Sequence, residues 1–352
     1  MSEPSLWVVI LAGGAGSRFW PVSTPSRPKQ LLPLAGPDTL ILQTVERVRP
    51  LVDDSRIRIL TGAWLERPIR EAVPGLGPDS FLIEPTAKGT APVLAWAAAE
   101  IERIEPGAVM ASLHADHVIS PAVAFRSQLA RIAAASASHR RLFTIGVTPT
   151  RAETGYGYIE PGRSLGDDES FVVDRFVEKP DEATAKAYVE RGFLWNTGLF
   201  VWPAALLLEE LRSHTPEIAV HLPLLDDGRV GEFFANVTSI TIDVALLERS
   251  DRIAVARAAF EWDDVGAWDA VARTREADAA GNVAVGDAHF VESENCIAWS
   301  EGGSVVTFGA SDMIVVHSGG ITFVAPRHRA PELKKLLDRL PASLKAPSGG
   351  DG

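Results

Sequence analysis

The sequence predicts an α/β fold with a mixed, mostly parallel sheet, helices on both faces of that sheet, and a small β-rich domain at the C-terminal end. Two observations lead to this expectation. Apolar, β-branched runs alternate with helical patterns through about the first 270 residues, as in chains whose parallel strands are joined by helices. After Gly281 the chain changes to a series of short apolar runs. We therefore expect a main domain over residues 1–280 and a β-rich domain over residues 281–352.

The strands expected in the main domain are short apolar runs, and amphipathic helical patterns lie between them. This order predicts a Rossmann-like arrangement, in which ligands bind beyond the carboxyl ends of the strands. The strands are expected over residues 6–11, 56–61, 81–83, 109–113 and 142–147, and the helices over residues 39–48, 64–73, 91–104 and 123–137.

One later helix has clear signals at both ends. Asp181 follows Pro180 and is placed to cap the first turn, and Gly192 can adopt the left-handed conformation that ends a helix. The β-rich domain is expected to close with a helix over residues 332–340 and a Ser/Gly-rich tail, 348–352, that is predicted to be disordered. Its strands are expected over residues 288–291, 296–299, 304–308, 313–317 and 321–325.

The composition is that of an ordinary globular protein, and it excludes several kinds of partner. The chain has 352 residues, 46% of them hydrophobic and 23% charged, and a formal net charge of −12. Nucleic acids and anionic membranes recruit basic faces, so neither is expected as a partner, and an anionic substrate must be bound by local positive charge. Cys296 is the single cysteine, and no secretory leader or membrane-spanning apolar run is apparent, so a reducing, cytoplasmic setting is expected.

The loop that follows the first predicted strand has the features of a phosphate-binding site. Its sequence is Leu-Ala-Gly-Gly-Ala-Gly-Ser-Arg-Phe-Trp-Pro over residues 11–21. Gly13, Gly14 and Gly16 can take positive φ and leave their amides uncovered, and consecutive exposed N–H groups bind anions. Arg18 and Lys29 add formal positive charge. The alternative is that the glycines only form the tight turn of a βα unit.

Two familiar phosphate-binding motifs do not fit this loop. The dinucleotide fingerprint Gly-x-Gly-x-x-Gly fails because Phe19 stands at the position of the third glycine, counted from Gly14 and Gly16. The loop of nucleoside triphosphatases requires Gly-Lys followed by Ser or Thr, and the sequence contains no such triplet.

Polar segments follow several predicted strands, and two of them offer aspartates for a metal ion. Asp116 lies in His-Ala-Asp-His (114–117), and Asp264 lies in Trp-Asp-Asp-Val-Gly (262–266). Two carboxylates from distant strands suit Mg²⁺, which prefers oxygen ligands. Each aspartate could instead cap a turn, and His114 with His117 could belong to a zinc hydrolase, although zinc sites of that kind need more imidazoles. The other polar segments expected at strand ends are 84–90, 178–180 and 195–198.

An ordered set of motifs extends over about three quarters of the chain. Its segments are Ala-Gly-Gly-Ala-Gly-Ser-Arg-Phe-Trp-Pro (12–21), Pro-Lys-Gln (28–30), Glu-Pro-Thr-Ala-Lys-Gly-Thr-Ala-Pro (84–92), Ala-Asp-His-Val-Ile (115–119), Gly-Tyr-Gly-Tyr-Ile (155–159), Glu-Lys-Pro (178–180), Trp-Asn-Thr-Gly (195–198) and Trp-Asp-Asp-Val-Gly (262–266). Together these segments resemble the mannose-1-phosphate guanylyltransferase family. The resemblance implies a sugar nucleotidyltransferase fold, and the reaction of GTP with mannose 1-phosphate to give GDP-mannose and pyrophosphate.

The resemblance also implies roles for individual residues. Arg18 would bind the triphosphate, Lys29 would neutralise charge near the attacked or leaving phosphate, and Lys179 would hold the sugar phosphate. Together with Asp116 and Asp264, these form the implied catalytic set. The implied nucleotide-binding residues are Ala12, Gly13, Gly14, Gly16, Ser17, Arg18, Lys29, Glu84, Pro85, Gly89, Thr90 and Asp116.

The sugar phosphate and the metal ion have their own implied residues. Mg²⁺, or another divalent cation, would be held by Asp116 and Asp264, with Asp263 as a less favoured second ligand. Tyr156 and Trp195 are interpreted as packing residues and left out of the site. The implied sugar-phosphate residues are Gly157, Glu178, Lys179 and Asn196.

Glu84 is a candidate for choosing the base. Guanine presents adjacent N1–H and N2–H₂ donors, and a carboxylate can accept a hydrogen bond from each. Glu84 could instead pair with Lys88 at the mouth of the loop.

Two residues depart from the family pattern, and other functions stay open. Thr24 stands where many bifunctional relatives carry arginine, and Val244 replaces a commonly aromatic residue. The chain after Gly281 is too short for the isomerase domain of those relatives, so that activity is not expected. The alternatives are a nucleotidyltransferase for another base or sugar, and a catalytically silent nucleotide-sugar-binding protein. A homodimer formed through the β-rich region is a further expectation, based on fold analogy.

Overall fold

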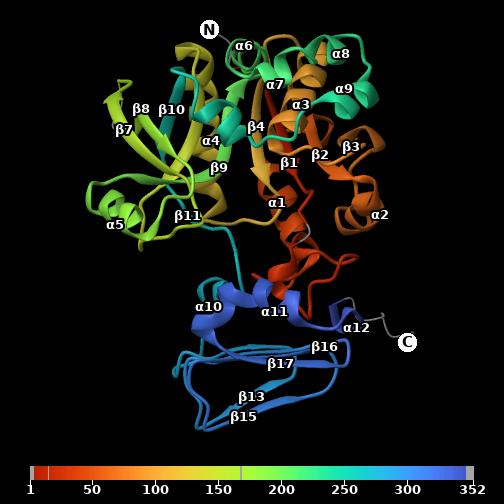
Figure 1. The fold of residues 1–352 in the computed structure, drawn as a ribbon, viewed down its shortest axis with the longest axis vertical. Coiled ribbons are helices and arrows are strands. Elements are labelled where there is room, and N and C mark those ends of the chain that lie inside the picture. The colour runs from red at the N-terminus through yellow and green to blue at the C-terminus, as the bar shows by residue number, and fades with distance from the viewer. Residues whose placement is uncertain (1–3, 15, 167–168, 346–352) are drawn as a thin grey trace.

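The computed structural model describes residues 4–14, 16–166 and 169–345. An α/β domain forms the upper part of Figure 1, and a narrower β-structure forms the lower part. Between them lie α10 (Asp269–Thr274), α11 (Leu333–Arg339) and α12 (Ala342–Lys345). The expected tail over residues 348–352 lies outside the described residues. Among the described residues, no helix has both the length and the apolar character that crossing a membrane requires.

The α/β domain is built on a mixed sheet, so the predicted fold class is confirmed. In the described chain nine strands take the order β3-β2-β1-β4-β9-β6-β10-β8-β7. The pairs β3–β2, β2–β1, β1–β4 and β6–β10 are parallel, whereas β9 runs antiparallel to both β4 and β6. The strands are β1 (Leu6–Leu11), β2 (Ile57–Gly62), β3 (Phe81–Glu84), β4 (Val109–His114), β6 (Leu142–Val147), β7 (Tyr158–Ser164), β8 (Ser170–Val177), β9 (Leu194–Pro203) and β10 (Ile253–Arg257).

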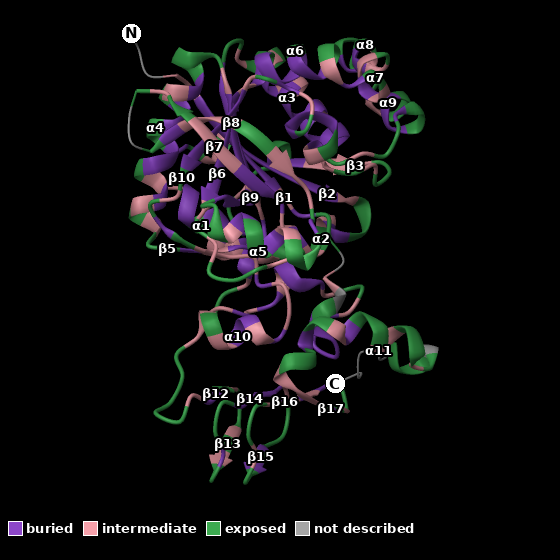
Figure 2. Ribbon diagram, turned by 60° about the vertical axis from the view of Figure 1, so that its left-hand side comes forward, coloured by how far each residue is buried: buried purple, intermediate pink, exposed green. Residues whose placement is uncertain are grey.

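Helices cover both faces of this sheet because alternate residues of each strand point to opposite sides. On β1, Trp7 and Val9 pack with α3 and α6–α9, while Val8 and Ile10 pack with α1, α2 and α4. Figure 2 shows that buried residues are concentrated on the strands of this sheet. The helices are α1 (Leu40–Val48), α2 (Ala63–Ala72), α3 (Thr90–Ile104), α4 (Ala122–His139), α5 (Glu182–Glu190), α6 (Ala204–His214), α7 (Pro216–Ala219), α8 (Leu222–Asp226) and α9 (Val230–Asn236).

The early strands and helices lie close to their expected positions, but two polar segments were placed wrongly. Residues 195–198 were expected in a loop at the carboxyl end of a strand, yet they lie near the start of β9. Because β9 is antiparallel to β4, its first residues reach the same edge of the sheet as the carboxyl ends of the parallel strands. Trp262 likewise lies in a short strand, β11 (Glu261–Asp263), which pairs with β5 (Val118–Ser120).

The C-terminal β-structure is a parallel stack closed by one antiparallel strand. β12 (Val283–Val285), β14 (Ile297–Ser300) and β16 (Met313–Ser318) pair in parallel, and β17 (Ile321–Pro326) pairs antiparallel with β16. Two further strands, β13 (Ala288–Val291) and β15 (Val305–Phe308), form a second parallel pair. The expected terminal helix is confirmed as α11 (Leu333–Arg339), followed by α12 (Ala342–Lys345).

One hydrophobic cluster joins the two parts of the chain. Trp268, which is fully buried, packs edge-on against Phe19 at 5.3 Å and against Trp299 of β14 at 5.5 Å between ring centroids. Its indole Nε1 donates a hydrogen bond to the carbonyl of Trp20 at 3.0 Å. The loop after β1 is therefore supported from below by α10 (Asp269–Thr274) and the β-structure (Figure 1).

Candidate active site

The glycine-rich loop after β1 is held open by a close contact with the Lys29 segment. Gly16 has φ +57, and a Cβ there would lie 2.4 Å from Cβ of Lys29, so only glycine fits. The expectation of positive φ is wrong for Gly13 and Gly14. A Cβ at either position would meet nothing within 4 Å. Their lack of side chains therefore keeps the space beside the loop open, rather than permitting an unusual backbone conformation.

Gln30 fixes the shape of the loop, a role that the sequence did not reveal. Its buried side-chain amide Nε2 donates to the carbonyl oxygens of Ala12 and Gly14, both at 3.1 Å. The Ala12 amide donates in turn to the carbonyl of Leu60 in β2 at 2.8 Å. The carbonyls of Ala12 and Gly14 are thereby engaged, and the exposed residues Gly13 and Gly14 can offer their amides to an anion.

A first cavity of about 300 Å³ opens beside the glycine-rich loop. Helix α3 begins at this cavity with Thr90, and the amino end of a helix attracts negative charge. Seven of the residues expected to bind nucleotide line it: Ala12, Gly13, Gly14, Glu84, Gly89, Thr90 and Asp116.

Glu84 faces this cavity from the end of β3. One carboxylate oxygen, Oε1, accepts a hydrogen bond from the backbone amide of Lys88 at 3.0 Å. Burial raises the pKa of Glu84, and the Lys88 amide partly offsets this rise. Glu84 therefore does pair with Lys88, as the alternative proposed, but through the backbone amide of Lys88. The carboxylate keeps further lone pairs that could accept hydrogen bonds from a ligand.

A second cavity of about 420 Å³ lies next to the first, and His114 lines both. All four residues expected to bind the sugar phosphate line the second cavity. Arg18 also lies here rather than in the first cavity, although it was expected at the nucleotide. The lining includes Arg18, Arg151, Tyr156, Gly157, Glu178, Lys179, Asn196, Asp243 and Asp264.

The two cavities meet at a cluster of charged side chains around Lys29. The Lys29 ammonium lies 2.8 Å from Oδ2 of Asp116, which lines the first cavity. It also donates to the backbone carbonyl of Asp264, which lines the second. Lys29 is itself buried, so its charge acts in a poorly solvated place and is weakly screened.

The electrostatics of Asp116 follow from these neighbours. Burial alone would raise the pKa of its carboxyl, but the Lys29 ammonium outweighs burial and holds the pKa well below its usual range. Burial lowers the pKa of both His114 and His117, so the imidazoles are neutral at physiological pH. Asp116 is thus an anion with fixed geometry.

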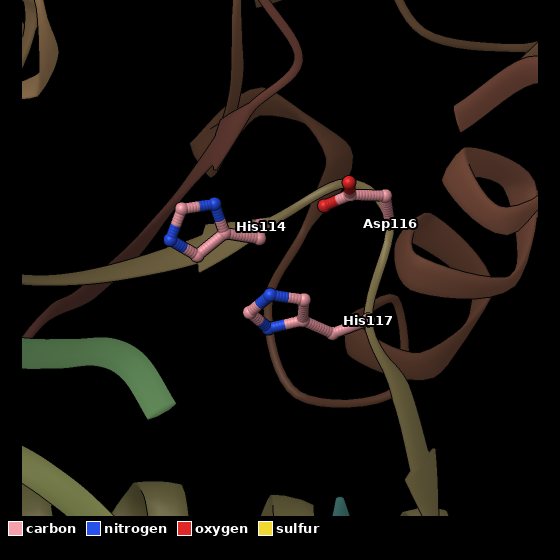
Figure 3. Close-up of side chains that lie close together, drawn as sticks. All are labelled: His114, Asp116 and His117. Atoms are coloured by element: carbon pink, nitrogen blue, oxygen red, sulfur yellow. The ribbon is translucent and has the colours of Figure 1, made fainter. Parts of the chain in front are cut away.

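Figure 3 shows His114, Asp116 and His117 gathered at the end of β4. Among the described residues, these three form a group whose potential ligand atoms lie within 4.8 Å of one another. Nδ1 of His117 already accepts a hydrogen bond from the indole of Trp262 at 3.1 Å. This hydrogen bond uses one ring nitrogen of His117, whereas His114 lines both cavities.

Asp264 is presented to the second cavity by a constrained turn. Val265 has φ +48, a conformation that β-branched residues rarely adopt. Its neighbour Asp263 points elsewhere: it accepts from the Val265 amide at 2.7 Å and forms an ion pair with Arg273 at 2.6 Å. Asp264 is therefore the better placed of the two aspartates, in line with the sequence-based preference.

Tyr156 is closer to the chemistry than its interpretation as a packing residue allowed. Its hydroxyl donates to Oδ1 of Asp264 at 2.5 Å, and burial followed by the charge of Asp264 raises the pKa of the phenol. Its ring also packs edge-on against Trp195 and Trp262. The Tyr156 side chain therefore packs against two aromatic residues and also orients the Asp264 carboxylate.

The sugar-side residues come together at one wall of the second cavity. A Cβ on Gly157 would lie 2.7 Å from Oε2 of Glu178, so the glycine allows this carboxylate to approach the backbone. The Asn196 amide donates to the Gly157 carbonyl at 2.8 Å. Lys179 is exposed and lies against Glu178. A cation and hydrogen-bonding groups therefore share this wall.

Several expected site residues line neither cavity. Gly16 lies against Lys29, and Lys29 contacts residues of the cavity walls, but neither lines a cavity itself. Pro85 is exposed and lines neither cavity. Ser17 lies in a short 3₁₀ helix, Ser17–Phe19, and its side chain is outside what the structure describes.

Two family models match consecutive parts of the chain. The first, described as nucleotidyl transferase, matches residues 7–281. The second, described as MannoseP isomerase/GMP-like beta-helix domain, matches residues 286–340 and corresponds to the parallel β-structure.

Named relatives cover nearly the whole chain. Mannose-1-phosphate guanylyltransferase of Escherichia coli is 34% identical over 97% of this chain and 75% of its own length. Xanthan biosynthesis protein XanB of Xanthomonas campestris is 34% identical over 94% of this chain and 72% of its own length. A crystal structure from Thermus thermophilus, described as mannose-1-phosphate geranyltransferase, superposes with a TM-score of 0.87 at 32% identity, covering 95% of this chain and 99% of the other. The chain therefore belongs to the nucleotidyl transferase family.

Proposed function

We propose that the protein is a mannose-1-phosphate guanylyltransferase, which forms GDP-mannose and pyrophosphate from GTP and mannose 1-phosphate. The observation that carries the proposal is the pair of adjoining cavities. One is lined by the glycine-rich loop and Glu84, the other by Glu178, Lys179 and Asn196. The names of relatives at 34% identity support the choice of GTP and mannose 1-phosphate.

In the proposed reaction, an oxygen of the sugar phosphate attacks the α-phosphorus of GTP in line as pyrophosphate leaves. The protein supplies positioning and charge, with no covalent nucleophile. Two polyanions must meet, and each close pair of unit charges costs about 4 kcal/mol at 4 Å and an effective dielectric near 20. Lys29 lies where the cavities meet, and Arg18 and Lys179 line the second cavity, so these cations offset the repulsion.

The residues fit a divalent cation. Asp116 is held ionised, Asp264 is oriented by Tyr156, and carboxylate oxygens are preferred ligands of Mg²⁺. Such an ion would neutralise phosphate charge at the junction of the cavities. The ammonium of Lys29 on Asp116 indicates that this position favours positive charge.

The proposal is tested by measuring pyrophosphate release from GTP, ATP, UTP and CTP, each with mannose 1-phosphate and with glucose 1-phosphate. We expect the highest kcat/KM with GTP and mannose 1-phosphate in the presence of Mg²⁺. A clear preference for another pair would assign a different nucleotidyltransferase activity. No pyrophosphate from any pair would support the catalytically silent alternative, against which the joint presence of Asp116, Asp264 and the three cations already argues.

Glu84→Gln is expected to reduce the preference for GTP over ATP by about tenfold or more. The amide replaces an acceptor by a donor opposite guanine, and lost hydrogen bonds to a charged group cost about 1.5–3 kcal/mol. Competition experiments with mixed nucleotides measure this preference. An unchanged ratio of kcat/KM values would remove Glu84 from base recognition.

Tyr156→Phe is expected to lower kcat by about tenfold, because the hydrogen bond that orients the Asp264 carboxylate is lost. The aromatic packing with Trp195 and Trp262 is kept, so the melting temperature should change little. Steady-state kinetics at saturating GTP measure the effect. Wild-type kcat in this variant would show that Asp264 needs no support from Tyr156.

The remaining expectations about the setting are also proposals. The division near residue 280, the cytoplasmic setting suggested by the single buried Cys296, and a homodimer through the β-structure rest on composition and fold analogy. Light scattering tests the last of these, and a monomer at assay concentration would contradict it.

A further inference from the structure

Asp243, to which the sequence analysis gave no role, places a carboxylate in the second cavity next to Val244, where the chain departs from the family pattern. It begins the short helical segment η5 (Asp243–Leu247), is half-buried, and lines the cavity together with Glu178 and Asn196. Its chain position is also fixed from the first cavity, because the amide of Ile242 donates to the hydroxyl of Thr90 at 2.8 Å. The backbone that carries the Asp243 carboxylate is therefore anchored to the first residue of α3.

The side chain of Asn196 is already committed to protein partners. Its Oδ1 accepts from the hydroxyl of Thr144 at 2.7 Å and from the amide of Gly198 at 3.3 Å. Its Nδ2 donates to Oδ1 of Asp243 at 3.1 Å. With both lone pairs of Asn196 Oδ1 in use, Asn196 offers a ligand one N–H at most.

Asp243 keeps the hydrogen-bonding capacity that Asn196 lacks. An ionised carboxylate can accept about four hydrogen bonds, and Asn196 donates one. Burial, followed by the nearby charge of Glu178, raises the pKa of Asp243 to about 6, whereas Lys179 acts in the opposite direction. The Asp243 carboxylate is thus ionised at neutral pH but poorly solvated. A neutral hydroxyl group would supply a hydrogen bond that water cannot readily supply there. A phosphate at the same position would be repelled.

We propose that Asp243 is a sugar-specificity residue, which accepts a hydrogen bond from one hydroxyl of the sugar 1-phosphate while Asn196 fixes its orientation. This inference rests on the proposed function, because it names a further contact for the same sugar substrate. Thr144 and Asn196 then act as positioning residues for Asp243.

The test is Asp243→Asn, assayed with mannose 1-phosphate and with its 2-, 3-, 4- and 6-deoxy analogues. Asparagine can keep an oxygen toward Asn196, but it then presents an NH₂ donor to the cavity in place of an acceptor. We expect KM for mannose 1-phosphate to rise by about tenfold or more, with KM for GTP within about twofold of wild type. For one deoxy analogue, the penalty seen with the wild-type enzyme should disappear in the variant, and this identifies the hydroxyl.

Glu248→Gln is the matched control, because Glu248 directly follows η5 but is exposed and does not line the cavity. It should leave both KM values unchanged. Asp243→Asn should be at least as stable as wild type at pH 8, since it removes a poorly solvated charge, so lost folding would not explain lost affinity.

Two results separate this inference from the proposed function. If the wild-type protein converts GTP and mannose 1-phosphate but Asp243→Asn shows the wild-type penalty with every deoxy analogue, the role of Asp243 is refuted and the function stands. If the wild-type protein releases no pyrophosphate from this pair, the proposed function itself fails.

Discussion

Replacing Asp116 or Asp264 by asparagine is expected to lower kcat by about a thousandfold. Each substitution removes one negative charge beside the junction of the two cavities. Each carboxylate would attract the proposed divalent cation, and the attraction between two opposite unit charges 4 Å apart is about 4 kcal/mol at an effective dielectric near 20. Losing that much stabilisation of the transition state corresponds to about three orders of magnitude in rate. Stopped assays of GDP-mannose formation at saturating substrates measure the loss.

The two variants should differ in their effect on Lys29. Asp116→Asn removes the carboxylate that lies 2.8 Å from the ammonium, so the buried cation loses its closest counter-charge. Asp264→Asn leaves the backbone carbonyl that Lys29 contacts. We therefore expect Asp116→Asn to be the less stable of the two. GTP binding, measured by calorimetry, should weaken less than turnover in both, because the glycine-rich loop is intact.

Asp287→Asn serves as the control for this pair. Asp287 is an exposed aspartate of the β-structure that pairs with His289, far from either cavity. Its kcat should match wild type. Near-normal turnover of Asp116→Asn or of Asp264→Asn would show that the proposed cation site lies elsewhere.

Trp268→Ala is expected to reduce the free energy of unfolding by about 3–5 kcal/mol, as for other fully buried tryptophans. The change removes contacts with Phe19 and Trp299, and it leaves the Trp20 carbonyl without its donor. Urea titration followed by fluorescence measures the loss. Turnover should also fall at temperatures where the variant is folded, because Arg18 adjoins Phe19 and depends on the same support.

Two further variants make this result specific. Trp64→Ala changes a tryptophan of α2 that is 51% exposed, and it should cost much less stability. Trp268→Phe keeps an aromatic ring but no N–H, so it separates packing from the hydrogen bond to Trp20. If Trp268→Ala were as stable and active as wild type, the β-structure would have no part in supporting the glycine-rich loop.

The order of strands and helices was readable because local patterns specify it. The runs that form β1, β4 and β6 are predominantly apolar, as expected for strands that are buried on both faces of a sheet. β9 was missed because it carries Asn196 and Thr197 among its apolar residues, and those polar side chains resemble a loop. Both side chains are buried and hydrogen-bonded to residues of the neighbouring strand β6, and the sequence of β9 alone does not reveal these bonds.

The same distinction applies to the site. The sequence by itself determined the glycine-rich loop, the aspartates that follow strands, and the cations near them, since each is a short motif with its own chemistry. Only the tertiary structure decided that Arg18 faces the second cavity, that Tyr156 bonds a carboxylate 108 residues away, and that Asp243 stands beside Asn196. These are contacts between distant segments. Their energies depend on burial and on distances of a few ångströms, which the packing of the whole sheet fixes.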